Sequence, residues 1–101
     1  MRSVDLALYA DELASRAATL AAELERARCR LRRDAIEREA RRALDEGSVA
    51  RLDALGVLHR GDSSALRAEM RELAASLTAL EELQAWVEAR LAAAQEELSA
   101  A

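Results

Sequence analysis

Each of the two long apolar-rich stretches of this chain carries two stripes of apolar residues, and this double pattern most constrains its fold. At about 100° per residue, one set in residues 4–46 stacks within about 60° of arc. This leucine stripe consists of Leu6, Leu13, Leu20, Leu24, Ala27 and Leu31. A second, alanine-rich stripe lies roughly 140° away. It consists of Ala14, Ala18, Ala21, Cys29, Ile36, Ala40 and Ala43. A helix with two apolar stripes has neighbours on two sides, and one hairpin partner covers only one of them.

Residues 65–98 repeat the double pattern with a regular heptad spacing. One core position is filled by Leu66, Leu73, Leu80, Val87 and Ala94, and the other by Met70, Leu77, Gln84, Leu91 and Leu98. Apolar heptads sustained over this length predict a coiled-coil-like packing. The second stripe on this helix consists of Ala68, Ala75, Ala79, Trp86 and Ala93. We therefore expect inter-chain contacts through this stripe and through Cys29, Ile36, Ala40 and Ala43 of the first helix.

The composition supports an all-α fold in a single helical domain over residues 1–101. There is no Pro and no Phe, whereas Ala occurs 25 times and Leu 17 times, and both residues favour helices. We expect helices at about 4–46, 49–55 and 65–98, with a kink or a change of packing partner near Arg33 and Asp34. Gly56 should end the short helix, and the Gly61–Ser64 segment should cap the last one. The predicted architecture is a long antiparallel hairpin with a short connecting helix. Dimerisation, or a partner chain, would complete a four-helix bundle.

The charge distribution favours helix pairing. The formal charge is −4, yet residues 26–33 contain five Arg, and residues 64–101 contain seven Glu against three Arg. An acidic chain of this kind is not a typical nucleic-acid or membrane binder. Arg26, Arg30 and Arg33 share one exposed arc, the arginine surface, which we expect to form salt bridges. Binding of an acidic partner or of nucleic acid through this surface is the alternative.

No residue pattern indicates catalysis, a metal or another cofactor. Cys29 is the only cysteine and His59 the only histidine, so a Cys-based metal site is excluded and His59 is expected to be a solvated loop residue. The absence of Lys excludes Schiff-base chemistry. We expect neither a signal peptide nor a membrane span near the N-terminus, since Asp5, Asp11 and Glu12 interrupt its apolar residues. We expect a cytoplasmic protein that is not an enzyme.

One polar set suggests a remote enzymatic alternative. Arg38, Arg42 and Gln84 are polar residues on otherwise apolar stripes. With them, the order of a long, a short and a third helix resembles the all-helical chorismate mutases, small dimers that place inward cations on a dianionic substrate. This chain lacks the family's lysine, and a hairpin would place Gln84 about 18 Å along the axis from Arg38. The three residues would have to converge across a dimer interface. The sequence therefore favours a non-catalytic interaction module, such as a small helical adaptor or a chaperone-like protein.

Overall fold

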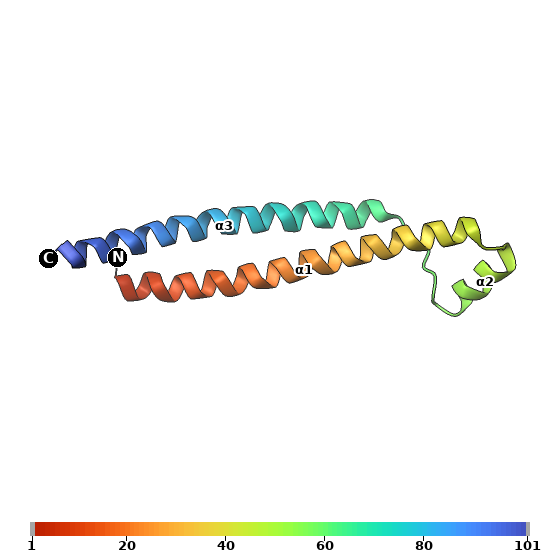
Figure 1. Ribbon diagram of the computed structural model, residues 1–101, viewed down its shortest axis with the longest axis horizontal. Coiled ribbons are helices and arrows are strands. Elements are labelled where there is room, and N and C mark those ends of the chain that lie inside the picture. The colour runs from red at the N-terminus through yellow and green to blue at the C-terminus, as the bar shows by residue number, and fades with distance from the viewer. Residues whose placement is uncertain (1, 101) are drawn as a thin grey trace. The chain divides into compact units, whose positions relative to one another are not determined.

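The computed structural model describes residues 2–100, which form three helices (Figure 1). They are α1 (Ser3–Ala43), α2 (Glu46–Ala54) and α3 (Ser63–Ala100). No strand occurs within the described range, so the predicted all-α class is confirmed, as is the hairpin of α1 and α3. The chain divides into two compact units. Unit 1 combines the residues up to Glu23 with those from Glu72 onward, and unit 2 comprises Leu24–Arg71.

Unit 1 is held together by the leucine stripe of α1 and the heptad residues of α3. Leu6, Leu13 and Val87 form its buried core, and Ala10, Leu80 and Leu91 pack against them. Val87 is 0% exposed, and complete burial of such a side chain contributes about 1.5–3 kcal/mol. The leucine stripe and the heptad pattern thus correctly indicate which faces of α1 and α3 meet in this unit. We call the face of α3 formed by Leu80, Gln84, Val87 and Leu91 the inner seam.

Unit 2 begins with the same kind of packing and then changes it. Leu24 and Ala27 are buried, and Leu31 is half-buried. Three residues further on, the inward positions of α1 become polar, starting with Asp34. Helix α1 continues without interruption through Arg33 and Asp34. Its contacts change instead, because the last turns of α1 meet α2 and the loop after it.

The helix boundaries in unit 2 differ from the expected ones by a few residues. Helix α2 begins at Glu46, three residues before the expected start, because Asp45 already has the extended backbone (φ −71°, ψ 159°) of an N-cap residue. Gly56 ends α2 as predicted: its φ is +73°, and Val57 N–H donates to the Leu52 carbonyl at 3.0 Å. This positive φ is the left-handed conformation of a Schellman-type stop.

Helix α3 begins at Ser63, two residues before the expected start. Asp62 accepts hydrogen bonds from the Ser64 N–H at 2.9 Å and the Ser64 hydroxyl at 2.6 Å. The side chain of Asp62 therefore satisfies a helix-end donor that would otherwise lack a partner. Hydrogen bonding by Ser64 also holds the pKa of the Asp62 carboxyl below its usual value.

The short helix α2 contributes little to the apolar packing of unit 2. Leu52 is half-buried, but Leu55 is 70% exposed because it lies at the C-cap, where the chain turns. Leu58, beyond the helix, is buried instead. Helix α2 itself buries no residue, so the loop after it provides the apolar anchor.

Candidate functional site: an exposed apolar face of α3

In unit 1, helix α3 carries a second apolar face that the rest of the unit leaves uncovered. Of the predicted interface residues, Ala75, Ala79, Trp86 and Ala93 lie here, and all four are exposed. Trp86 is 51% exposed, although the next residue, Val87, is completely buried. Apolar residues therefore line two sides of the same helix, and only one side has a neighbour. Such an uncovered apolar face on a small protein is typical of a binding surface.

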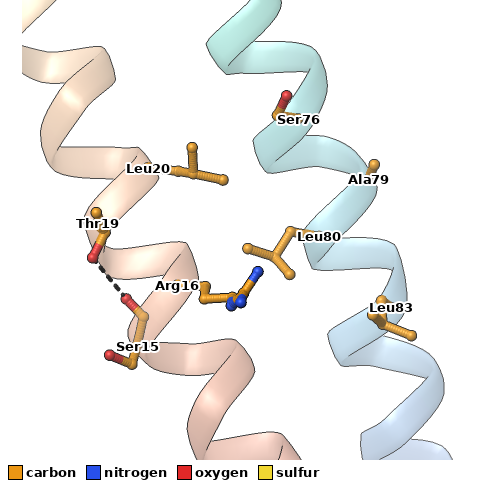
Figure 2. A pocket seen from close by; sticks show the side chains of 8 residues that line it. All are labelled: Ser15, Arg16, Thr19, Leu20, Ser76, Ala79, Leu80 and Leu83. Carbon is orange, nitrogen blue, oxygen red and sulfur yellow. Dashed lines mark hydrogen bonds between the residues drawn. The ribbon is translucent and has the colours of Figure 1, made fainter.

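A groove of about 540 Å³ lies beside this face, between α1 and α3 of unit 1 (Figure 2). Its lining residues are Ser15, Arg16, Thr19, Leu20, Ser76, Ala79, Leu80 and Leu83. Leu20 and Leu80 point toward one another across its floor in Figure 2. The Thr19 hydroxyl donates to the Ser15 carbonyl at 3.1 Å, so this hydroxyl already has a hydrogen-bond partner within α1. Small side chains at Ser76 and Ala79 leave room on the α3 side for groups from another molecule.

Leu83 is a member of this face that the alanine stripe did not reveal. It is 36% exposed and lines the groove. Its position could have been found from the spacing, because residues 79, 83 and 86 alternate by four and three as in a second heptad pattern. Leu83 was missed because the second stripe was defined mainly by small residues.

A neighbouring cation contacts the indole of Trp86. The Arg90 guanidinium lies over the ring, 5.8 Å from its centroid, within the range of a cation–π interaction. Arg90 covers one face of the ring. Half of the Trp86 surface is still exposed, so the rest of the indole can contact another molecule. Trp is also among the residues that most often dominate protein interfaces.

The other predicted interface residues lie in unit 2, and none of them lines the groove of unit 1. Ala68, Cys29, Ile36 and Ala43 are exposed, and Ala40 is half-buried. Ile36 is 68% exposed, so it offers a single large apolar contact. Cys29 lies among polar groups: Arg32 Nη2 donates to its Sγ at 3.0 Å, and its thiol lies 3.8 Å from a Glu25 oxygen.

The arginine-rich segment is largely salt-bridged. Arg28 and Arg32 both pair with Glu25, at 3.8 and 3.1 Å, and hydrogen bonding by Arg32 lowers the Glu25 pKa. Arg30 contacts both carboxylate oxygens of Glu69 on α3 at 3.3 Å. The predicted pairing with the acidic last helix is therefore confirmed at this position. Arg26 and Arg33, the other members of the arginine surface, are exposed.

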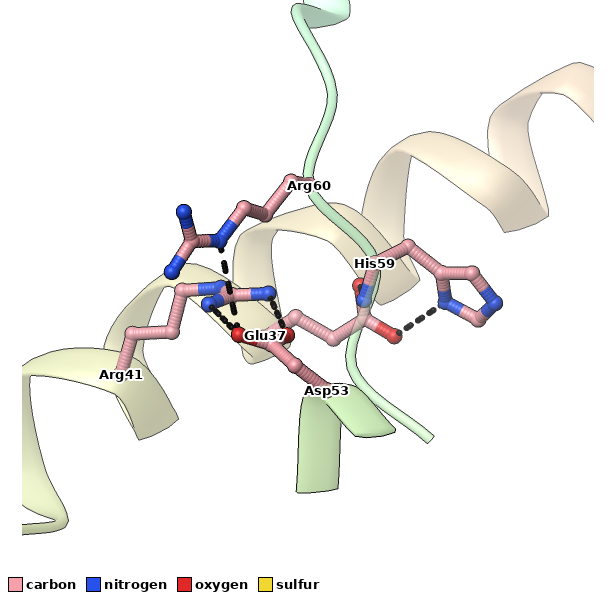
Figure 3. Close-up of polar contacts among 5 residues, drawn as sticks. All are labelled: Glu37, Arg41, Asp53, His59 and Arg60. Carbon is pink, nitrogen blue, oxygen red and sulfur yellow. Dashed lines mark hydrogen bonds and ion pairs between the residues drawn. The ribbon is translucent and has the colours of Figure 1, made fainter. Parts of the chain in front are cut away.

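A polar cluster in unit 2 ties the connecting segment to α1 (Figure 3). Arg41 donates to both carboxylate oxygens of Asp53 on α2, and Arg60 Nε lies 3.4 Å from the same carboxylate. Glu37, only 7% exposed, accepts from the His59 backbone N–H at 3.4 Å, and its other oxygen lies 3.2 Å from His59 Nδ1.

These contacts shift the ionisation of both acids. Hydrogen bonding by His59 lowers the pKa of Glu37, despite the opposing effect of its burial. Hydrogen bonding by Arg41 lowers the pKa of Asp53. The sequence did not indicate this cluster, since it joins residues 12 and 22 positions apart that share no periodic pattern. His59, expected to be solvated, keeps an exposed ring but is held by Glu37.

The cluster borders a pocket of about 380 Å³ lined by Asp34, Glu37, Arg38, Arg41, His59, Arg60 and Gly61. Arg38 lines it and donates to the Ser63 hydroxyl at 3.1 Å. Arg42 is exposed and does not line it. Gln84 is half-buried in unit 1, within the inner seam. The two cationic side chains of the remote enzymatic alternative therefore do not converge in this pocket.

No family model, curated protein or solved structure matches the chain. Across residues 2–100, no group of three or more His, Cys, Asp or Glu side chains is placed to hold a metal ion. None of the helices in that range has the length and apolar character needed to cross a membrane.

Proposed function

We propose that this protein is a non-catalytic protein–protein interaction module that acts through helix–helix packing. The observation that carries this proposal is the uncovered apolar face of α3, with Ala79, Leu83 and Trp86 beside the groove of unit 1. The partner is a second copy of the chain or another helical protein, and the product is a four-helix or similar bundle.

The energetics of Trp86 support this role. An aromatic side chain buries about 150–250 Å² in an interface, and Trp86 retains 51% of its exposure. Covering the remainder removes about 100 Å² from water, a gross hydrophobic gain of about 2.5 kcal/mol at about 25 cal/mol per Å², from which the entropy cost of association is subtracted. Leu83 adds to this term. A helix docking by residues spaced three and four apart matches the shape of such a groove.

Other features fit a small adaptor or chaperone-like protein. Exposed Ile36 provides a further apolar contact on α1. The exposed thiol of Cys29 would remain reduced in the cytoplasm, the location that we propose. The arginine-rich segment, with three of its five arginines (Arg28, Arg30 and Arg32) in salt bridges, provides a charged border rather than the principal contact.

A matched pair of substitutions on α3 tests the proposal. Ala79→Arg places a charge in the exposed apolar face, whereas Ala85→Arg makes the same change about 120° away around the helix, at another exposed position. We expect Ala79→Arg to lower the molar mass measured by light scattering and Ala85→Arg to leave it unchanged. Circular dichroism should show equal helicity in both variants.

If the wild-type chain is monomeric, a photo-crosslinking residue replaces Ala79 in one variant and Ala85 in a control variant, and both are crosslinked in cells. The crosslinked protein is identified by mass spectrometry, and the complex is rebuilt from purified components. A reconstituted complex that Ala79→Arg weakens and Ala85→Arg does not would support the proposal. The absence of both self-association and such a complex would overturn it.

A further inference from the structure

Building on the assembly role proposed above, we propose that the uncovered face of α3 binds a second copy of this chain, with the two α3 helices antiparallel about a two-fold axis. This proposal commits to one partner and one register. It comes from the order of charged, small and large residues on the exposed face.

Six residues form this face, and we call them the outer seam: Glu72, Ser76, Ala79, Leu83, Trp86 and Arg90. Their spacing alternates by four and three, so they lie within about 80° of arc on the helix. All six are exposed and belong to unit 1. The centre of the outer seam lies about 90° around α3 from the inner seam. A helix at the corner of a four-helix bundle needs two contact faces separated by an angle of this size.

The order of residues along the outer seam is complementary to its own reverse. In one antiparallel register, Glu72 lies opposite Arg90 of the second copy, and Arg90 lies opposite the second Glu72. Within residues 2–100 of the single chain, neither side chain forms an ion pair. Both charges are therefore free to pair between chains. Two opposite-charge pairs at the ends of a contact favour one orientation and one register.

Side-chain size is matched in the same register. Trp86 lies opposite Ser76, and Leu83 lies opposite Ala79, so each large residue meets a small one. Ser76 and Ala79 line the groove of about 540 Å³, which leaves room for the incoming indole and leucine. Interdigitation of large and small residues is the way helices pack closely. The groove of each chain would thus receive the large residues of the other.

Arg16 is the one charged residue among those lining the groove. Its Nε lies 3.9 Å from a Glu12 oxygen, and 72% of its side chain is exposed. Arginine can lay its aliphatic stem along an apolar surface while the guanidinium stays in water. Its presence is therefore compatible with a partner seated in the groove.

Other arrangements of the two helices lose these matches. A parallel pair would place Glu72 against Glu72 and Arg90 against Arg90. An antiparallel shift by one heptad would place Leu83 against Trp86, with Glu72 against Glu97. The opposite shift would place Leu83 against Glu72. Like charges in contact, or an apolar group facing a carboxylate, disfavour each of these alternatives.

Charge reversal and mixing test both the partner and the register. Glu72→Arg alone and Arg90→Glu alone would each place like charges opposite one another twice in the dimer. We expect each to weaken self-association by about tenfold, measured by sedimentation equilibrium of the full chain. An equimolar mixture of the two variants should form a heterodimer with the affinity of the wild-type protein, because opposite charges then meet at both ends. The double variant should likewise regain self-association.

Glu81→Arg serves as the control, because it makes the same charge change at an exposed position about 180° from the outer seam. Restored association in the mixture, with Glu81→Arg like the wild type, would support the proposal. A wild-type dimer that responds equally to Glu72→Arg and Glu81→Arg would overturn this register while leaving an assembly role intact. A wild-type chain that is folded and monomeric at high concentration would overturn self-association, and the assembly role would then depend on the reconstituted partner complex described above.

Discussion

Replacing Val87 by Ala measures how strongly the packing of α1 against α3 stabilises unit 1. Val87 is completely buried beside Leu6 and Leu13. Loss of two methyl groups costs about 1.6 kcal/mol at about 0.8 kcal/mol each, and the cavity left behind adds to this cost. The higher helix propensity of Ala recovers up to about 0.6 kcal/mol. We expect Val87→Ala to lower the free energy of unfolding by about 2 kcal/mol.

Urea unfolding followed by far-UV circular dichroism provides the measurement. With a denaturant dependence of about 2 kcal/mol per M, the midpoint should fall by about 1 M. Val4→Ala is the control, since it makes the same change in α1 at a position that is 59% exposed. All samples need the same protein concentration, because self-association would make the midpoint depend on it. Equal midpoints for the two variants would refute the packing assigned to unit 1.

Three further predictions concern unit 2. Gly56→Ala should speed amide hydrogen exchange in residues 46–56 by about tenfold or more, since an L-residue at a positive φ costs about 1–2 kcal/mol. The control, Gly61→Ala, has open space around its Cβ and should leave exchange unchanged. Equal effects of the two substitutions would contradict the turn assigned to Gly56. The Glu37 carboxyl, followed by NMR, should titrate below its ordinary value, because hydrogen bonding by His59 favours the charged form. The stability that this contact contributes is therefore present above the unfolded-state pKa of about 4.3 and is lost as the pH falls through the lower folded-state pKa. His59→Ala should raise the midpoint of the Glu37 titration, and an unchanged titration midpoint would argue against the contact. Finally, we expect no gel shift of DNA or RNA at low salt, whereas a salt-sensitive shift abolished by sign reversal of the arginine surface would favour the nucleic-acid alternative.

Much of the fold could be predicted from the sequence because helix faces are periodic. The heptads in residues 65–98 indicated that Leu80, Val87 and Leu91 turn toward α1, and these residues do pack in the core of unit 1. Gly56 was recognised as a helix stop from its residue type alone, since glycine adopts a positive φ without strain. Signals of this kind depend only on residues that are near one another in the sequence.

The candidate site was predicted in part. The alanine stripe located the exposed side of α3, including Ala79 and Trp86, but it passed over Leu83. Helical periodicity alone does not distinguish an apolar residue in the hairpin contact from one left exposed. The structure made this distinction by showing that the inner seam is covered and that Leu83 lines an open groove.

The polar cluster of unit 2 was decided only by the tertiary structure. The Glu37–His59 and Arg41–Asp53 contacts join residues 22 and 12 positions apart. They depend on the path of the chain after α2, which no helical repeat specifies. Sequence periodicity thus determined which residues form helices and which faces are apolar, because both follow from local backbone geometry. The burial of Glu37 and the exposure of Trp86 depended on how separate segments meet, since burial is a property of the packed chain.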